Sequence, residues 1–386
     1  MRSVLGDLPA ATFLRDYWQK RPLVVRQAIP GFAGIVARDE LLALATRGDA
    51  VSRLVIEHPR RRRARWERHD GPFGGLDASM LPPSHWTLLV HGVESLVPGG
   101  WELLGRFSFV PAARIDDLMV SYAADGGSVG PHDDRYDVFL LQGGGRRRWH
   151  IMRGGDRSVD PDARIRVLSR FVADEEWLLE PGDMLYLPPG VAHYGVAEGP
   201  SFTYSIGFLA PSHQVLVESF LGYLAHALVP RIDAGALVAD RAPKVPREWL
   251  ALHDGLVDEV ARVVGAIRWD ARMIEDFVGR FVTSPKAHVV FTPPVRPLAP
   301  DAFARRLAAR GRLELALPSR GLVRGRRLFF NGEAHDAART TLRLFTELVG
   351  ERAISLPRPV DDRTLALLHG WYAAGYLDVR RARTAG

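Results

Sequence analysis

Short apolar segments between glycine- and proline-rich turns fill residues 105–210, and this pattern constrains the fold more than any other feature of the chain. Leu118–Tyr122, Val138–Leu141 and Met184–Leu187 are examples of such segments. Short strands at regular spacing are typical of an antiparallel barrel rather than of a parallel sheet. The sequence therefore predicts a β-barrel over about residues 105–210.

A candidate metal site lies within this predicted barrel. Alternate side chains of a strand point to one face, so His132 and Asp134 can project together into the barrel interior. A second histidine, His193, follows the turn-rich stretch Leu185–Gly190. Two histidines and one carboxylate that leave other positions open form the facial triad of non-haem Fe(II) oxygenases. His132-x-Asp134 alone also fits a strand with two hydrogen-bonded polar residues, but its combination with His193 favours a metal site.

Several motifs in the first 210 residues resemble, in order, those of the JmjC-type (cupin) 2-oxoglutarate oxygenases. The likeness is to the bacterial ribosomal oxygenases, which are arginine hydroxylases of a large-subunit ribosomal protein. The motifs are Tyr17–Pro22, Gly71–Phe73, Arg114–Met119, Val129–Asp134, Tyr136–Phe139, Gly145–Trp149 and Tyr204–Phe208. A weaker likeness continues toward the C-terminus through Asn331–Glu333 and Gly375–Tyr376.

The resemblance implies an α+β protein in three parts. These are a double-stranded β-helix (a cupin or JmjC jelly roll) in residues 1–210, a helical dimerisation segment in 211–292 and a winged-helix domain in 293–386. It implies Fe(II) held by His132, Asp134 and His193, with 2-oxoglutarate as co-substrate and O2 as oxidant. The implied reaction converts 2-oxoglutarate to succinate and CO2 and adds a 3-hydroxyl to an arginine of 50S ribosomal protein L-16. The enzyme would be a cytoplasmic homodimer.

Three consecutive arginines follow the glycine turn 143–145, and on a strand Arg147 faces opposite to Arg146 and Arg148. A dicarboxylate co-substrate needs a fixed cation at its far end, and a guanidinium binds a carboxylate through two parallel hydrogen bonds. In the resembling family the middle arginine has this role, which points to Arg147. Its odd spacing from His132 requires a bulge or a strand change, which the glycine turn supplies. The alternative is that all three arginines are surface charges.

Three further side chains are candidates for the pocket. Tyr136 shares the inward parity of His132 and Asp134, so we expect it to line the substrate pocket or to be a core aromatic residue. Thr203 and Ser205 share one face of the return strand, and either hydroxyl can contribute to binding the co-substrate carboxylate.

Composition limits the other chemistry. The chain has no cysteine, which excludes disulfides, thiolate metal sites and cysteine nucleophiles and fits a reducing cytoplasm. No run of apolar residues is long enough for a transmembrane helix. The net charge is +6, and the basic run Arg60–Arg63 can contact nucleic acid or form a solvated hairpin tip. We favour the hairpin tip and expect no direct nucleic-acid binding.

The pattern changes after Pro211. Apolar stripes at helical spacing predict helices over residues 215–229, 249–267 and 272–282. A hairpin signal at Asn331-Gly332, with helices on either side, resembles a winged helix. Three other functions remain open: the same iron chemistry on a histidine or a methyl-lysine, a cupin enzyme that does not use 2-oxoglutarate, and a DNA-binding regulator whose cupin senses a ligand.

Overall fold

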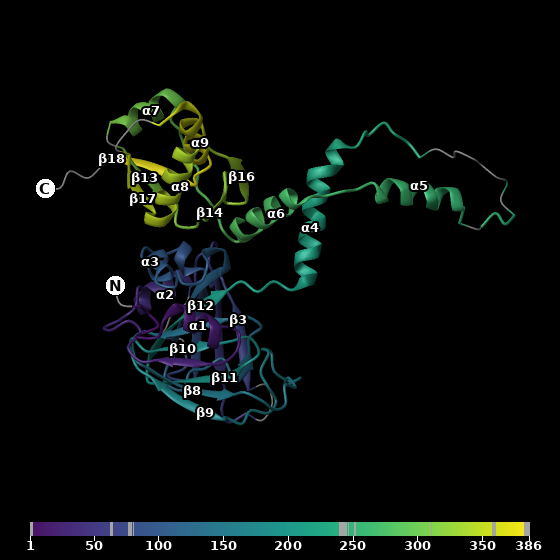
Figure 1. Cartoon of the computed structure of the whole chain (residues 1–386). Helices are drawn as coiled ribbons and strands as arrows, with labels where there is room; N and C mark the ends of the chain where they lie inside the picture. The colour runs from purple at the N-terminus through teal and green to yellow at the C-terminus, as the bar shows by residue number, and fades with distance from the viewer. Residues whose placement is uncertain are drawn as a thin grey trace.

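The computed structural model of the chain describes residues 3–61, 65–75, 79, 81–238, 245, 247–250, 252–309, 311–356 and 360–381. A strand-rich N-terminal half and a smaller C-terminal domain are adjacent, and a helical arm extends away from both (Figure 1). Within these ranges, no helix combines the length and the apolar character needed to span a membrane.

Two antiparallel sheets form the N-terminal half. In the described residues the larger sheet has the strand order β1–β10–β7–β12–β5–β4–β2–β3 and the smaller one β6–β11–β8–β9. The strands of the larger sheet are β1 (Leu23–Val25), β2 (Val51–Glu57), β3 (Trp66–Asp70), β4 (Trp86–His91), β5 (Ile115–Ala123), β7 (Val138–Gln142), β10 (Met184–Leu187) and β12 (Ser201–Phe208). Those of the smaller sheet are β6 (His132–Asp133), β8 (Arg146–Met152), β9 (Glu175–Leu179) and β11 (Ala192–Glu198).

The two sheets face each other, as their shared apolar residues show. Val138 and Leu140 of β7 belong to one buried cluster with Trp149 and Ile151 of β8. Alternate residues of a strand point to opposite sides of its sheet, so the polar residues that share the parity of Val138 also face the space between the sheets. This arrangement confirms the predicted jelly roll.

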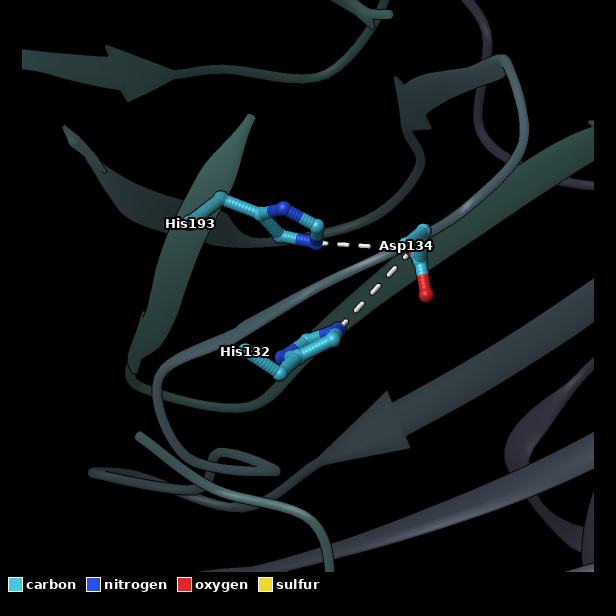
Figure 2. Close-up of side chains that lie close together, drawn as sticks. All are labelled: His132, Asp134 and His193. Carbon is cyan, nitrogen blue, oxygen red and sulfur yellow. Dashed lines mark ion pairs between the residues drawn. The ribbon is translucent and has the colours of Figure 1, made fainter. Parts of the chain in front are cut away.

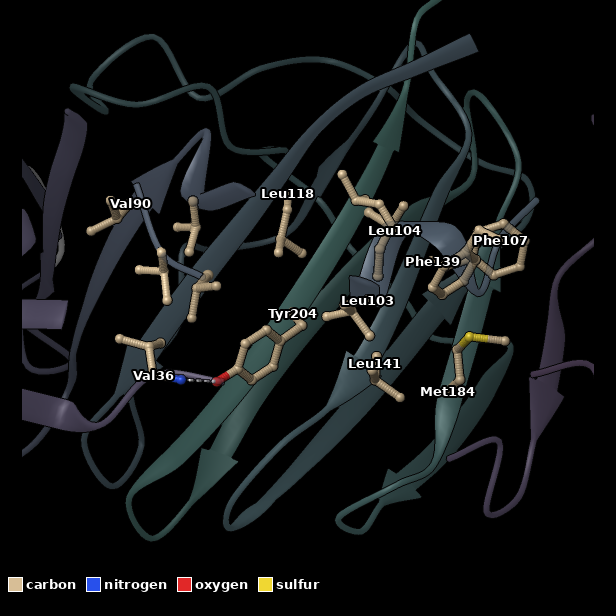
Figure 3. Close-up of a cluster of buried hydrophobic side chains, with 14 of the residues drawn as sticks. Val36, Val90, Leu103, Leu104, Phe107, Leu118, Phe139, Leu141, Met184 and Tyr204 are labelled. Atoms are coloured by element: carbon tan, nitrogen blue, oxygen red, sulfur yellow. Dashed lines mark hydrogen bonds between the residues drawn. The ribbon is translucent and has the colours of Figure 1, made fainter. Parts of the chain in front are cut away.

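The opposite face of the larger sheet builds the main core. Four fully buried side chains of this core point away from the smaller sheet, namely Leu118, Phe139, Leu141 and Tyr204. Figure 3 shows them with their neighbours. Three short helices cover this face: α1 (Ala10–Asp16), α2 (Arg38–Leu44) and α3 (Gly100–Gly105). The 3-10 turns η2 (Val93–Ser95) and η3 (Ala112–Arg114) flank α3.

Helix α1 is shorter than the helical pattern of residues 9–20 indicates. It ends at Asp16, and the following turn carries Gln19 with a positive φ of 58°. The backbone N–H of Gln19 donates to the hydroxyl of Tyr186 at 2.8 Å, and the Trp18 ring stacks on the Tyr186 ring. Contacts with the sheet therefore replace the last helical turn.

The strands β2 and β3 form the hairpin expected around the arginine-rich segment. Arg61 donates to Glu67 at 2.9 Å, and Arg65 pairs with Glu57. Arg62 and Arg63, which belong to the predicted Arg60–Arg63 run, lie outside the described residues.

The arm after the jelly roll contains α4 (His213–Leu228), η4 (Val229–Arg231), α5 (Asp254–Gly265) and α6 (Ala271–Thr283). The rings of Phe220 and Phe277 are 5.2 Å apart and join α4 to α6. Helix α5 begins at Asp254, five residues later than the apolar stripe from Trp249 indicated, and it has no buried residue. Its apolar stripe is thus left facing solvent in a single chain.

The C-terminal domain has the predicted winged-helix organisation. Its helices are α7 (Pro300–Ala308), α8 (Arg339–Glu351) and α9 (Asp362–Ala373). Its strands are β13 (Gly311–Leu315), β14 (Gly321–Arg324), β15 (Arg327–Phe330), β16 (Glu333–Asp336), β17 (Ala353–Ser355) and β18 (Leu377–Arg381). Asn331 and Gly332 connect β15 to β16 with positive φ values of 49° and 85°, as a type I′ hairpin turn requires.

Candidate metal and co-substrate site

The three predicted metal ligands converge between the sheets. His132 lies on β6, and His193 is its register partner on the neighbouring strand β11. The strand β6 ends at Asp133, so Asp134 lies just after it, whereas the sequence predicted Asp134 to lie on the strand. The Oδ2 atom of Asp134 is 4.0 Å from Nε2 of His132 and 3.7 Å from Nε2 of His193 (Figure 2). One ligand atom of each residue lies within 4.8 Å of the others.

Backbone carbonyls fix both imidazole rings. Nδ1 of His132 is 2.9 Å from the carbonyl oxygen of Gly130, and Nδ1 of His193 is 3.0 Å from that of Val191. Each Nδ1–H can therefore donate outward, which leaves the Nε2 lone pairs directed at the common point. Burial, together with the neighbouring His132, lowers the pKa of His193 to about 4. The ring is thus neutral at physiological pH, the form that binds a metal.

A cavity of about 290 Å³ opens in front of these ligands. Apolar side chains from both sheets form part of its wall, including Val138, Leu140 and Trp149. The Trp149 ring lies 5.8 Å from the ring of His193 and 5.8 Å from the guanidinium carbon of Arg147. Arg147 and the candidate metal ligands therefore line one cavity, and the Trp149 ring lies near both.

Arg147 faces this cavity from β8 and is 5% exposed. In the part of the chain that the structure describes, its Nε and Nη2 atoms have no hydrogen-bond partner. Burial lowers the pKa of Arg147 to about 10, so the group is still charged at neutral pH. A buried charge without a partner is unfavourable, and a bound carboxylate would supply the partner. The donor set therefore fits a metal together with an anionic co-substrate.

The neighbouring arginines face the other way. Arg148 donates to Glu198 at 2.7 Å and to Glu176 at 2.5 Å, and Arg146 pairs with Glu198 at 3.6 Å. The glycine turn that precedes them ends at Gly145, whose φ is +74°. This turn carries the chain from the larger sheet to the smaller one, which is the strand change that the odd spacing required.

The other predicted pocket residues also line the cavity. Thr203 is 1% exposed and its hydroxyl lies 3.4 Å from Oε1 of Gln142, while Ser205 is 5% exposed. Tyr136 is 40% exposed at the cavity's edge, which makes it a wall residue rather than a core aromatic residue. Partial burial against the cavity wall and the charge of the nearby Asp134 raise the pKa of Tyr136.

Sequence reasoning did not identify a second row of cavity residues on β5. Asp117, Met119 and Ser121 point inward and are the register partners of Gly207, Ser205 and Thr203 on β12. Although burial alone would raise it, the pKa of Asp117 is lowered by its hydrogen bond with His91 and by the charge of Lys286. The sequence did contain a signal for this row, because Asp117, Met119 and Ser121 alternate along one predicted strand and therefore share a face.

Comparisons with known proteins agree with this geometry. Residues 102–216 match the JmjC domain family, and residues 266–378 match the ROXA-like winged-helix family. The "Ribosomal protein uL16 3-hydroxylase" of Escherichia coli K12 is 32% identical over 336 residues, which cover 84% of this chain and 85% of that protein. A "Probable ribosomal oxygenase" of Haemophilus influenzae is 39% identical over 219 residues, which cover 55% of this chain and 53% of the relative.

A solved structure extends the likeness to the whole fold. E. coli YcfD, a ribosomal oxygenase in complex with cobalt and 2-oxoglutarate, aligns with a TM-score of 0.78 at 30% identity, over 97% of this chain and 99% of YcfD. Metal and 2-oxoglutarate are thus bound in a protein of the same architecture. Since the E. coli hydroxylase is similar over most of both sequences and the JmjC and winged-helix families both match, the chain belongs to the JmjC-type bacterial ribosomal oxygenases.

Proposed function

We propose that this chain is an Fe(II)- and 2-oxoglutarate-dependent hydroxylase that adds a 3-hydroxyl to an arginine of ribosomal protein uL16. The observation that carries the proposal is the pairing of two features in one cavity. His132, Asp134 and His193 converge there, and Arg147 presents a buried, unpartnered guanidinium to the same space. A metal site alone fits many cupins, whereas the added buried cation is suited to a co-substrate that has a second carboxylate.

Each side chain then has a defined task. His132, Asp134 and His193 hold Fe(II), and Arg147 binds the distal carboxylate of 2-oxoglutarate with help from the hydroxyls of Thr203 and Ser205. Iron, when bound, supplies the oxidising chemistry that couples decarboxylation of 2-oxoglutarate to hydroxylation. The apolar wall of Val138, Leu140 and Trp149 excludes water from that reaction. Tyr136, at the edge of the cavity, borders the path of the substrate side chain.

The protein substrate is inferred from the relative that hydroxylates uL16. An arginine side chain is long enough to reach into the cavity while its backbone stays outside, and Asp117 on the β5 wall is a carboxylate that can face a cationic group there. Because ribosomal proteins are met in the cytoplasm, we also propose a cytoplasmic enzyme. We propose no direct contact with nucleic acid.

The assembly that we propose is a homodimer built on the helical arm. Five apolar residues of α5 are between 41% and 58% exposed, namely Leu256, Val257, Val260, Val263 and Val264. An exposed apolar stripe of this kind is suited to burial against a second copy, and twofold pairing is the commonest symmetry of oligomers. We keep the division into 1–210, 211–292 and 293–386 as a working proposal for catalytic, dimerisation and winged-helix parts.

The decisive experiment is turnover of purified uL16 with Fe(II), 2-oxoglutarate and O2, followed by mass spectrometry of the product. We expect one added oxygen on an arginine, with succinate formed in equal amount. A control uL16 in which that arginine is replaced by lysine should stay unmodified. Oxygen added to a histidine would show that the enzyme is a histidine hydroxylase and not an arginine hydroxylase. Turnover without 2-oxoglutarate would refute the assignment of 2-oxoglutarate as co-substrate.

A further inference from the structure

Arg320 joins the winged-helix domain to the jelly roll. Its backbone is held inside the winged helix, where its N–H donates to Oδ1 of Asn331 at 2.8 Å. Its side chain leaves that domain and reaches the jelly roll. Nη2 donates to Oε1 of Glu94 at 2.7 Å, and Nη1 donates to the carbonyl oxygen of Ile115 at 3.1 Å. The carbonyl oxygen of Asp116 accepts a third bond.

Glu94 carries this contact to strand β5. Its second oxygen, Oε2, accepts a hydrogen bond from the backbone N–H of Leu118 at 3.0 Å. Glu94 is 1% exposed and the Arg320 side chain is 17% exposed, so water screens the pair weakly. The guanidinium and the carboxylate together hold the backbone at residues 115, 116 and 118, where β5 begins.

The residue in the middle of this held segment lines the catalytic cavity. Asp117 projects inward from β5, and its carboxylate is 3.2 Å from Nδ1 of His91. A second contact from the C-terminal half reaches the same place, because Lys286, which follows α6, pairs with Asp116 at 2.9 Å and lies 4.0 Å from Asp117.

The two walls of the cavity are held by different means. The candidate metal ligands and Arg147 belong to, or directly follow, strands of the smaller sheet, whereas Asp117, Met119 and Ser121 belong to β5 of the larger sheet. The side-chain contacts of Arg320 and Lys286 described above all reach the β5 wall, directly or through Glu94. A change at Arg320 should therefore move the wall that faces the metal without moving the metal ligands.

We infer that Arg320 is a positioning residue for the hydroxylation: through Glu94 it sets the start of β5, and so the cavity wall against which the substrate side chain is placed. The winged-helix domain then takes part in substrate recognition by bracing the catalytic domain. This inference rests on the proposed hydroxylation of a protein side chain for its kinetic test, but the bracing itself has a test that needs no substrate.

The kinetic test compares Arg320→Met with Arg320→Lys in the full chain. Arg320→Met removes the charge and all three hydrogen bonds, and we expect the KM for uL16 to rise about tenfold or more. The KM for 2-oxoglutarate should rise much less, because Thr203 and Ser205 pair with Ser121 and Met119, which lie farther along β5 than the residues that Arg320 and Glu94 hold. Arg320→Lys keeps the charge but lacks the planar, two-pronged donor geometry, and it should recover part of the loss. The matched control is Arg324→Met at the end of β14, which removes an exposed pair with Glu275 of α6.

The substrate-free test is amide hydrogen exchange, measured on Arg320→Lys and on Glu94→Gln. We expect faster exchange at Leu118 and its neighbours on β5, and unchanged exchange on β8 and β11. If Arg320→Met alters the KM values of uL16 and 2-oxoglutarate equally, or if β5 exchanges as in the unmodified chain in both variants, the inference is wrong. A parent enzyme that ignores uL16 but loses β5 protection in these variants would refute the proposed function and leave the bracing established.

Discussion

Replacing Arg147 by methionine should change stability and co-substrate affinity in opposite directions. In the folded chain this guanidinium is 5% exposed, and burial lowers its pKa from the ordinary 12.5 to about 10. Since each tenfold change in a protonation equilibrium is worth about 1.4 kcal/mol, holding Arg147 charged costs the ligand-free fold on the order of 3 kcal/mol. Methionine fills much of the same volume without a charge, so Arg147→Met should stabilise the ligand-free protein by up to that amount.

The same change should weaken 2-oxoglutarate binding. Hydrogen bonds to a charged group are worth about 1.5–3 kcal/mol each, and about 1.4 kcal/mol corresponds to a factor of ten in affinity. Loss of even one such bond therefore predicts a fall of about tenfold to a hundredfold. Arg147→Lys should lie between the two because lysine keeps the charge but lacks the planar, two-pronged donor geometry.

Denaturant unfolding of the ligand-free proteins measures the change in unfolding free energy. Calorimetric titration of 2-oxoglutarate, with cobalt in place of iron, measures the change in affinity. Arg146→Met and Arg148→Met are the controls, because their side chains pair with Glu198 and Glu176 on the outside of the sheet. If either control loses affinity as Arg147→Met does, the assignment of the inward arginine is wrong. If Arg147→Met both destabilises the ligand-free fold and leaves affinity intact, the guanidinium is a structural group and the co-substrate reasoning fails.

Three further predictions concern the metal, pH and assembly. Alanine at His132, Asp134 or His193 should abolish metal binding by calorimetry while circular dichroism shows a folded protein; retained activity in any of the three would contradict the triad. The folded pKa of His193, about 4, lies below its unfolded value near 6.5, so the metal-free protein should lose about 2 kcal/mol of unfolding free energy between pH 7 and pH 5. That loss should shrink in a His193→Phe variant. Finally, Val260→Asp on α5 should turn a dimer into a monomer by light scattering, and a monomeric parent would refute the dimer.

Much of the jelly roll could be predicted because its information is local. Alternation along β7 and β12 separates the outward core residues, such as Phe139 and Tyr204, from the inward residues Val138, Thr203 and Ser205. Period-two alternation needs no knowledge of distant contacts. The hairpin at Asn331-Gly332 was predictable for a similar reason, since its two positive φ angles select those residue types.

The features that were missed depend on distant parts of the chain. Helix α1 ends at Asp16, and the backbone N–H of Gln19 instead donates a hydrogen bond to the hydroxyl of Tyr186, which is far away in the sequence. The Glu94–Arg320 pair joins residues 226 positions apart, and neither residue stands out from the many charged residues around it. Asp117 could be suspected from its parity on β5, but its neighbours His91, on β4, and Lys286, after α6, come from distant parts of the chain. Only tertiary structure brings such residues together.

The position of Arg147 shows how a short turn can decide the chemistry of a cavity. A single regular strand could not present both His132 and Arg147 to one side, because an odd number of residues separates them and side chains alternate. The chain resolves this by crossing from the larger to the smaller sheet through the turn that ends at Gly145, whose positive φ disfavours other residues. A shift of one residue in that turn would bring Arg146 and Arg148 inward and leave Arg147 outside. The identity of the inward cation is therefore fixed by the backbone of the turn as much as by the arginine itself.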